Sequence, residues 1–353
     1  MPNLFKDMLK GDESLFLDIG VLDPDFIPPV IEGRENEQQW IASCIKPLFL
    51  HRPGRHAFIT GSPGIGKTLA VRYLLQELEQ ETQEIFPVYI NCWKKDSPHK
   101  IMLALCEALG YTFVQNRTVG ELLEEIAKII NKKSAVLVLD EADKILDESI
   151  LYHLLESLLP ISLLLVSNDA EYLSVLDDRI ISRLHAEEIV FASYTFDETY
   201  QILQKRAHHA FVPHVFEKDA FDLLVQKAFA LRDIRAGLFL LREAGEQAES
   251  HSSRKIQLRH AESALTILSL FKIRSSAGLN EDDQKLLQLI KNHSGITMSE
   301  LYALYKRHGQ EKTYRTFNRK IDVMAKQRII TKKTISAYPG RTTKVYYGGL
   351  LPS

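Results

Sequence analysis

The sequence contains little cysteine, and this shortage excludes the disulfide-rich proteins. Cys44, Cys92 and Cys106 are the three cysteines among 353 residues, and none lies near another. Disulfide frameworks need an even set of cysteines, and zinc sites need ligands at close spacing. We therefore expect three reduced thiols in a cytoplasmic protein, buried as small apolar side chains.

Long apolar runs are also missing. The longest, at residues 158–166, contains Pro160 and is too short to cross a bilayer. The first residues include Asp7, Asp12 and Glu13, which interrupt the apolar stretch that a signal peptide needs. The sequence therefore predicts a protein without a membrane partner.

The net charge is small, but it is unevenly distributed. The whole chain carries −2, whereas fifteen Lys and Arg stand against six Asp and Glu from Arg274 to the end. That part carries +9 and leaves −11 for the rest. A basic module beside an acidic body indicates that the module binds a polyanion, with a chance fluctuation of charge as the alternative.

Apolar and turn patterns divide the chain into four parts. Residues 1–33 are irregular, 34–194 alternate β-branched runs with helical patterns, 195–274 are helical throughout, and 275–353 show three short helical patterns and a hairpin. The alternation in the second part predicts an α/β fold with a five-stranded parallel sheet between helices. The expected strands are Ala57–Thr60, Pro87–Asn91, Ala135–Leu139, Ser162–Ser167 and Glu188–Phe191.

A complete phosphate-binding loop follows the first expected strand and opens a helix. Its residues are Gly61, Ser62, Pro63, Gly64, Ile65, Gly66, Lys67 and Thr68. Glycines let backbone N–H groups point at phosphate oxygens, and the helix dipole favours the negative charge. Lys67 is expected on the β- and γ-phosphates of ATP, and the Thr68 hydroxyl on Mg²⁺. A glycine-rich turn matched by chance is the alternative, and the strand, helix, lysine and threonine together argue against it.

Polar residues end two later strands. Asp140 and Glu141 follow the apolar run Val136–Leu139, and Asn168 follows another apolar strand. Asp140 is expected to hold Mg²⁺, and Glu141 to act as the general base for the attacking water. Asn168 is expected to hold that water against the γ-phosphate, with a simple turn as the alternative.

Three arginines are further candidates for contact with phosphate. Arg179 and Arg183 lie four residues apart on an expected helix, and an arginine there could reach the nucleotide of a neighbouring subunit. Arg235 lies in the helical part and could reach the nucleotide from a lid. For each of them, a solvated or ion-paired arginine on a helix surface is the alternative.

These motifs, in this order, resemble those of the AAA+ ATPases, and most closely those of the archaeal initiators related to origin-recognition and cell-division-cycle proteins. The resemblance covers nearly the whole chain from about Pro28. It implies an AAA+ core, an all-helical lid and a C-terminal winged helix. The stretches that carry it are Gly61–Thr68, Val136–Asp143, Ser167-Asn168 with Leu176–Leu184, and Arg232–Ala244.

The resemblance also assigns roles to single residues. It makes Asn168 the first sensor, Arg183 the arginine finger ahead of Arg179, and Arg235 the second sensor. Two positions depart from the family pattern. Arg232 replaces the glycine before the lid helix, and Asp178 stands where proline is usual. The DNA-touching insertion of the family has a weak counterpart at residues 110–119.

The last part has the layout of a DNA-reading module. Its third expected helix, from about Gln310 to Arg328, places Tyr314 and three further apolar residues on one side and basic residues on the other. A merely solvated basic helix is the alternative, and the basic hairpin that follows argues against it. The expected DNA-binding residues are Lys312, Arg315, Arg319, Lys326, Lys332, Lys333, Arg341 and Lys344.

Together, these features predict an ATPase of replication initiation with ATP or ADP and Mg²⁺ as cofactors. It is expected to bind origin DNA through the winged helix and the AAA+ core, and to help recruit or load the replicative helicase. Other initiator subunits are further expected partners, and the protein would act as a monomer or as an oligomer assembled on DNA, in the cytoplasm at the nucleoid. A non-replicative ATPase switch, such as a transposition helper or branch-migration motor, is the alternative. A DEAD-box helicase is excluded because the chain lacks a second strand-alternating half.

Overall fold

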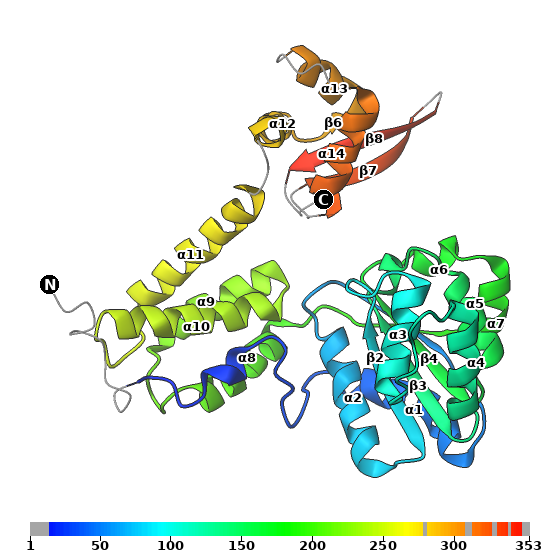
Figure 1. The fold of residues 1–353 in the computed structure, drawn as a ribbon. Coiled ribbons are helices and arrows are strands. Elements are labelled where there is room, and N and C mark those ends of the chain that lie inside the picture. The colour runs from blue at the N-terminus through cyan, green and yellow to red at the C-terminus, as the bar shows by residue number, and fades with distance from the viewer. Residues whose placement is uncertain (1–13, 278–280, 308–312, 327–329, 338–339, 348–353) are drawn as a thin grey trace, which may run out of the picture. The chain divides into compact units, whose positions relative to one another are not determined.

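The computed structural model describes residues 14–277, 281–307, 313–326, 330–337 and 340–347. The chain forms two compact units, Met1–Ala264 and Leu265–Ser353. Figure 1 shows the elements of each unit, and the units are described in turn below.

The first unit contains a five-stranded parallel sheet with the strand order β2-β3-β4-β1-β5. Each strand predicted from the sequence is confirmed to within two residues. Strands β3 and β4 consist of buried residues throughout, as expected of central strands that are covered on both faces. The strands are β1 (Ala57–Thr60), β2 (Ile85–Asn91), β3 (Ser134–Asp140), β4 (Ile161–Ser167) and β5 (Glu187–Val190).

Helices cover both faces of this sheet, as Figure 1 shows. Side chains alternate along each strand, so that Leu137 and Leu139 of β3 enter one apolar core while Val136 and Val138 enter the other. The first core is closed by α3 (Pro98–Ala108), α4 (Val119–Ile130), α5 (Ser149–Ser157) and α7 (Asp178–Leu184), and the second by α1 (Glu35–Ile45) and α2 (Lys67–Glu81). Short helices complete this part: η3 (Lys46–Leu50), η4 (Ala142–Lys144) and α6 (Tyr172–Val175).

The expected buried thiols are present. Cys44, Cys92 and Cys106 are all buried and free. Burial is the main cause that raises the pKa of Cys44 to about 11 and that of Cys92 to about 12. Both thiols are therefore protonated at neutral pH, which makes them poor nucleophiles and poor metal ligands.

The strand order determines where the polar residues meet. Strand β1 lies between β4 and β5, and β4 lies between β1 and β3. In the register of these pairs, Thr60 lies opposite Ser167, and Asp140 lies opposite Val166. The P-loop, Asp140 and Asn168 therefore leave the sheet at the same edge, where α/β proteins of this kind bind their ligands.

Among the described residues, helices and their connecting loops make up the rest of the first unit after the sheet, as expected for residues 195–274. The helices are α8 (Phe196–Ala210), α9 (Lys218–Leu231), α10 (Ile234–Ser250) and α11 (Leu258–Ala277). Helix α8 begins with a capping box, in which Thr195 and Glu198 bond to each other's backbone N–H groups. The end of α9 shows why the family pattern has glycine at position 232. Arg232 adopts a left-handed φ of 52°, which glycine adopts without strain.

Residues near the N-terminus are part of this helical layer. The N–H of Leu17 donates to the carbonyl of Ala210 (2.8 Å), and that of Val212 donates to the carbonyl of Leu15 (2.9 Å). The short helix η2 (Ile19–Leu22) then lies along α8, in blue in Figure 1. Residues 14–22 thus pack on the lid helices α8 and α10, although the next helix along the chain, α1, belongs to the AAA+ core.

The second unit has the expected three helices and hairpin, with a two-residue strand added. Strands β6, β8 and β7 form an antiparallel sheet in that order. Phe317, Ile321 and Met324 are buried as predicted, whereas Tyr314 is 46% exposed. Tyr314 is the first residue of its helix, and its ring packs edge-on against Tyr302 instead of entering the core. The elements are α12 (Glu281–Asn292), β6 (Ile296–Thr297), α13 (Met298–Arg307), α14 (Tyr314–Lys326), β7 (Ile330–Ala337) and β8 (Gly340–Tyr347).

Among the described residues, no helix is both long and apolar enough to cross a bilayer.

Candidate nucleotide site

The P-loop has the backbone conformation that its glycines predict. Gly61, Gly64 and Gly66 have φ values of 146°, 77° and 92°, which side chains rarely adopt. Space is also restricted, since a Cβ atom on Gly61 would lie 2.5 Å from the carbonyl oxygen of Phe191. Because the loop leads directly into α2, its N–H groups and the helix dipole favour an anion at the same place.

Lys67 lies inside this loop and is almost fully buried. Its Nζ donates to the carbonyl oxygens of Gly61 (2.6 Å) and Ser62 (3.0 Å) and to Oδ1 of Asn168 (2.8 Å). Nδ2 of Asn168 donates in turn to Oε2 of Glu141 (2.8 Å). One chain of hydrogen bonds therefore joins Lys67, Asn168 and Glu141, which the sequence separates by up to 101 residues.

Asp140 faces the first turn of α2. Its Oδ2 accepts hydrogen bonds from the hydroxyls of Thr68 (2.8 Å) and Tyr89 (2.6 Å), and its Oδ1 accepts from the N–H of Glu141 (2.9 Å). Burial, together with the charge of Asp140, raises the pKa of Tyr89, so the phenol stays protonated and donates. Tyr89 was not among the expected site residues, although strand alternation places it on the same face as Asn91, which pairs with Asp140.

Arg34, which was also not among the expected site residues, binds a backbone carbonyl of the P-loop. The side chain is 4% exposed, and Nε and Nη2 both donate to the carbonyl of Ile65 (3.2 and 3.1 Å). Nη2 also donates to the carbonyl of Ala192 (2.6 Å), and Nη1 pairs with Glu37 (2.9 Å). The guanidinium lies 4.0 Å from the ring centre of Tyr194. Arg34 therefore ties the loop to the end of β5.

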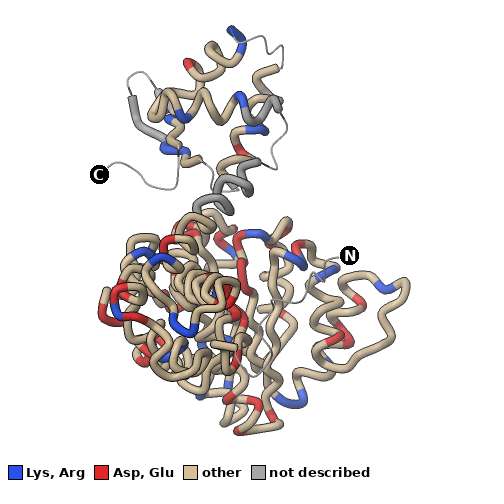
Figure 2. Tube along the Cα trace, turned by 90° about the vertical axis from the view of Figure 1, so that its left-hand side faces the viewer, with Lys and Arg blue, Asp and Glu red and all other residues tan. Residues whose placement is uncertain are grey.

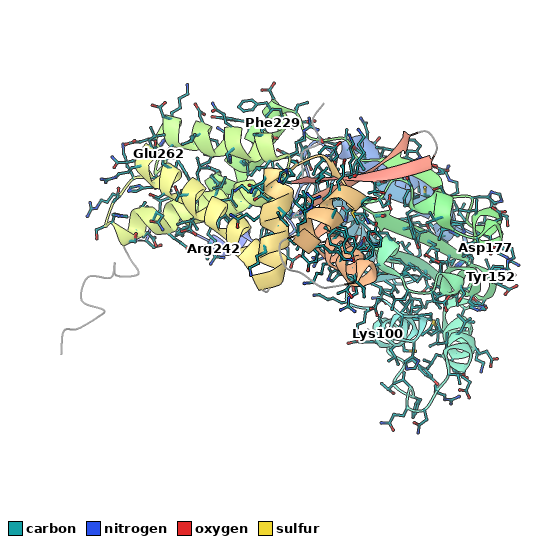
Figure 3. All side chains as sticks on the ribbon, turned by 90° about the horizontal axis from the view of Figure 1, so that it is seen from above. Lys100, Tyr152, Asp177, Phe229, Arg242 and Glu262 are labelled. Atoms are coloured by element: carbon teal, nitrogen blue, oxygen red, sulfur yellow. The ribbon has the colours of Figure 1, made fainter. Side chains whose placement is uncertain are left out.

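The two arginines of α7 have different surroundings. Arg183 lies over the ring of Tyr152 (4.6 Å), and its Nη2 donates to the Tyr152 hydroxyl (3.0 Å) and to Glu156 (3.2 Å). Arg179 is 81% exposed and pairs with Asp177, the N-cap of α7. Figure 3 labels Tyr152, which belongs to α5, and Asp177, which precedes α7. Within the part of the chain that the structure describes, the side-chain hydrogen bonds of both arginines are made with residues of α5 and with the N-cap of α7, and their expected role as arginine fingers stays a prediction.

Arg235 lies at the start of α10, in the lid. Its guanidinium pairs with both carboxylate oxygens of Asp233, the N-cap of the same helix. Ile234 lies between Asp233 and Arg235, and its backbone N–H donates to the carbonyl of Gly64 in the P-loop (3.1 Å). The lid and the phosphate-binding loop are thus in direct contact beside Arg235.

The candidate DNA-binding residues are described only in part. Lys312 lies outside the described residues, as do the side chains of Arg315, Lys326 and Arg341. Arg319 and Lys333 are exposed, Lys344 is half-buried, and Lys332 pairs with Asp322 of α14. Figure 2 shows Lys and Arg in blue along this unit and few acidic positions in red.

Comparison with known proteins identifies the family. The model of the AAA domain matches residues 51–171, and that of the Cdc6 AAA+ ATPase-type lid domain matches residues 200–266. The ORC1-type DNA replication protein 2 of Archaeoglobus fulgidus is 31% identical over 316 residues, which cover 84% of this chain and 81% of that protein. The chain belongs to the ORC1-type DNA replication proteins. As a member of this family it is a nucleotide-binding AAA+ ATPase of replication initiation.

Other relatives agree with this assignment. The ORC1-type protein 1 of Sulfurisphaera tokodaii is 30% identical, with 82% of this chain and 78% of that protein covered. The solved structure of the Aeropyrum pernix ORC1 protein in complex with DNA has a TM-score of 0.74 at 28% identity, with 94% of each chain covered. A branch-migration motor, RuvB of Thermotoga maritima, has a TM-score of 0.53 at 16% identity over 91% of this chain and 95% of that one, a likeness of fold alone.

Proposed function

We propose that this ORC1-type protein binds double-stranded DNA at a replication origin under the control of ATP, and helps to recruit or load the replicative helicase there. The observation that carries the proposal is the hydrogen-bonded chain of Lys67, Asn168 and Glu141 beside the Thr68–Asp140 pair. This arrangement gives one site the groups to bind a nucleotide and to respond to its third phosphate. The site of action would be the nucleoid, in the cytoplasm.

Thr68 and Asp140 suit a magnesium ion. A hydroxyl and a carboxylate oxygen lie 2.8 Å apart at the mouth of the P-loop. Magnesium binds oxygen ligands and takes few of them from the protein when phosphates supply the rest. The bound ion would neutralise charge on the phosphates, while Tyr89 and the N–H of Glu141 keep the Asp140 carboxylate in place.

The remaining residues have separate roles in this proposal. Lys67 exchanges its carbonyl partners for phosphate oxygens. Glu141 takes the proton of the attacking water, and Asn168 keeps that water in line between Glu141 and the γ-phosphate. Arg235 acts from the lid of the same chain. Arg183, ahead of Arg179, acts on the nucleotide of a neighbouring subunit in an oligomer assembled on DNA.

DNA binding is assigned to both the core and residues 275–353, which lie in the second unit and which we interpret as a winged helix. The +9 charge of the segment from Arg274 supports this, and so does the order of three helices and a hairpin. The candidate contacts are Lys312, Arg315, Arg319, Lys326, Lys332, Lys333, Arg341 and Lys344. The Aeropyrum pernix ORC1 protein, which is 28% identical, has been solved in complex with DNA.

The proposal is tested by sequencing the DNA that is recovered with the protein from its own cells, for the natural chain and for Lys67→Ala. We expect enrichment at one or a few origins for the natural chain and weaker enrichment for Lys67→Ala. Uniform coverage that salt abolishes, with no preferred site for either chain, would contradict an initiator role because it is the behaviour of nonspecific phosphate contacts.

A further inference from the structure

The turn before α10 places a carboxylate on the P-loop. A Cβ atom built on Gly64 would lie only 2.0 Å from Oδ1 of Asp233, so this oxygen rests against the backbone of the loop. The N–H of Ile234 donates to the carbonyl of Gly64 from the same turn. A negative charge therefore lies at the edge of a loop that is built to bind phosphate.

The same carboxylate also forms an ion pair with the guanidinium of Arg235. Oδ1 of Asp233 accepts from Nε of Arg235 (3.1 Å), Oδ2 accepts from Nη2 (3.0 Å), and Oδ1 also caps the helix by accepting from the N–H of Arg235 (2.9 Å). This bidentate geometry is also the one in which a guanidinium binds phosphate. A γ-phosphate that bound Arg235 would consequently compete with Asp233 for the same face of the side chain.

A second copy of the motif shows which of these contacts is special. Asp177 caps α7, and its two oxygens accept from Nε and Nη2 of Arg179 at 3.0 and 3.1 Å. The cap and the ion pair are therefore a local property of Asp-x-Arg at a helix start. What Asp233 has in addition is its contact with Gly64, which brings the carboxylate to the phosphate site.

We propose that Asp233 is a positioning residue that holds Arg235 beside the P-loop and releases it to the third phosphate. The carboxylate thereby lowers the affinity for ATP relative to ADP, and it makes closure of the lid depend on the γ-phosphate. This inference rests on the proposed function, since it concerns the same nucleotide site.

The test compares the dissociation constants of ADP and of a non-hydrolysable ATP analogue, measured by calorimetry with Mg²⁺ on the full chain. Asp233→Asn keeps the shape and the helix cap but removes the charge. We expect it to tighten binding of the ATP analogue about three- to fivefold, the equilibrium effect of one partly exposed ion pair, and to leave ADP unchanged. Asp177→Asn is the matched control and should change neither constant.

A double-mutant cycle with Arg235→Gln separates the possible outcomes. If Asp233 acts through Arg235, the gain seen with Asp233→Asn disappears in the Arg235→Gln background. A gain that persists there would mean simple charge repulsion and would overturn the proposal, and so would equal weakening of both nucleotides. Failure of the natural chain to bind either nucleotide would instead contradict the proposed function.

Discussion

Replacing Arg34 by methionine should loosen the P-loop without touching the nucleotide directly. Methionine keeps an unbranched stem but cannot donate to the carbonyls of Ile65 and Ala192, which are 3.1 and 2.6 Å from Nη2. A hydrogen bond to a charged group contributes about 1.5–3 kcal/mol, and a buried acceptor left unpaired costs a similar amount. With two carbonyls affected and the Glu37 pair lost, we expect the free energy of unfolding to fall by about 3 kcal/mol.

The loop should also bind nucleotide less tightly. If half of that loss, about 1.5 kcal/mol, appears as misalignment of the folded loop, the dissociation constants of ADP and ATP both rise about tenfold. Urea unfolding gives the stability, and calorimetry at a temperature where the variant is folded gives the affinity. The two nucleotides should weaken equally, since Ile65 lies in the part of the loop that both share.

Arg206 offers a matched control in the lid. It is 7% exposed, donates to the carbonyls of Val21 (3.0 Å) and Phe26 (3.2 Å), and stacks on the ring of Phe26. Arg206→Met should cost similar stability but leave the affinity of the folded protein unchanged. A role of Arg34 in aligning the P-loop is refuted if Arg34→Met is destabilised and still binds ADP as the natural chain does, or if the two variants weaken binding alike.

Three further predictions follow from single residues. Glu141→Gln should keep ATP binding but slow turnover at least ~100-fold, whereas Glu148→Gln, seven residues along, should not; undiminished turnover would exclude Glu141 as the base. Arg232→Gly relieves a φ of 52° at the end of α9 and should raise the free energy of unfolding by about 0.5–1 kcal/mol, seen as a higher melting temperature. Burial lowers the pKa of His56 to about 4, and its Nδ1 accepts from the N–H of Leu163. The unfolded chain takes up this proton near pH 6.5 and the folded one does not, so stability should fall as the pH drops from 6.5 to 4. His56→Gln should flatten that slope.

The sequence predicts those parts of the fold and of the site that a short, continuous stretch of residues specifies. Each strand was a short apolar run, and each P-loop residue had a fixed place in one motif, so the sheet and the loop followed from patterns alone. Asp140, Glu141 and Asn168 were expected at the site because each stands at, or directly after, the end of such a strand, and the structure brings them together at one edge.

Residues whose partners are distant backbone atoms were not predicted. Arg34 donates hydrogen bonds to carbonyls 31 and 158 residues away. Because every residue has a backbone carbonyl, no sequence pattern indicates which one such a side chain binds. Tyr89 resembled any aromatic residue in a buried strand until its hydroxyl was placed on Asp140. The contact of Asp233 with Gly64 likewise depends on how the lid packs, which no local pattern states.

The packing of residues 14–22 on the lid has a consequence for how the lid can move. The chain crosses between lid and core once between Phe26 and Arg34, and again between Phe191 and Thr195. The two crossings touch, since a Cβ atom on Gly33 would lie 3.4 Å from both Tyr194 and Glu198. Because two segments of the chain pass this point together, a rotation of the lid about it would leave both segments intact, whereas a translation would have to stretch both. Rotation about this point is therefore the motion that would carry Asp233 and Arg235 to and from the P-loop.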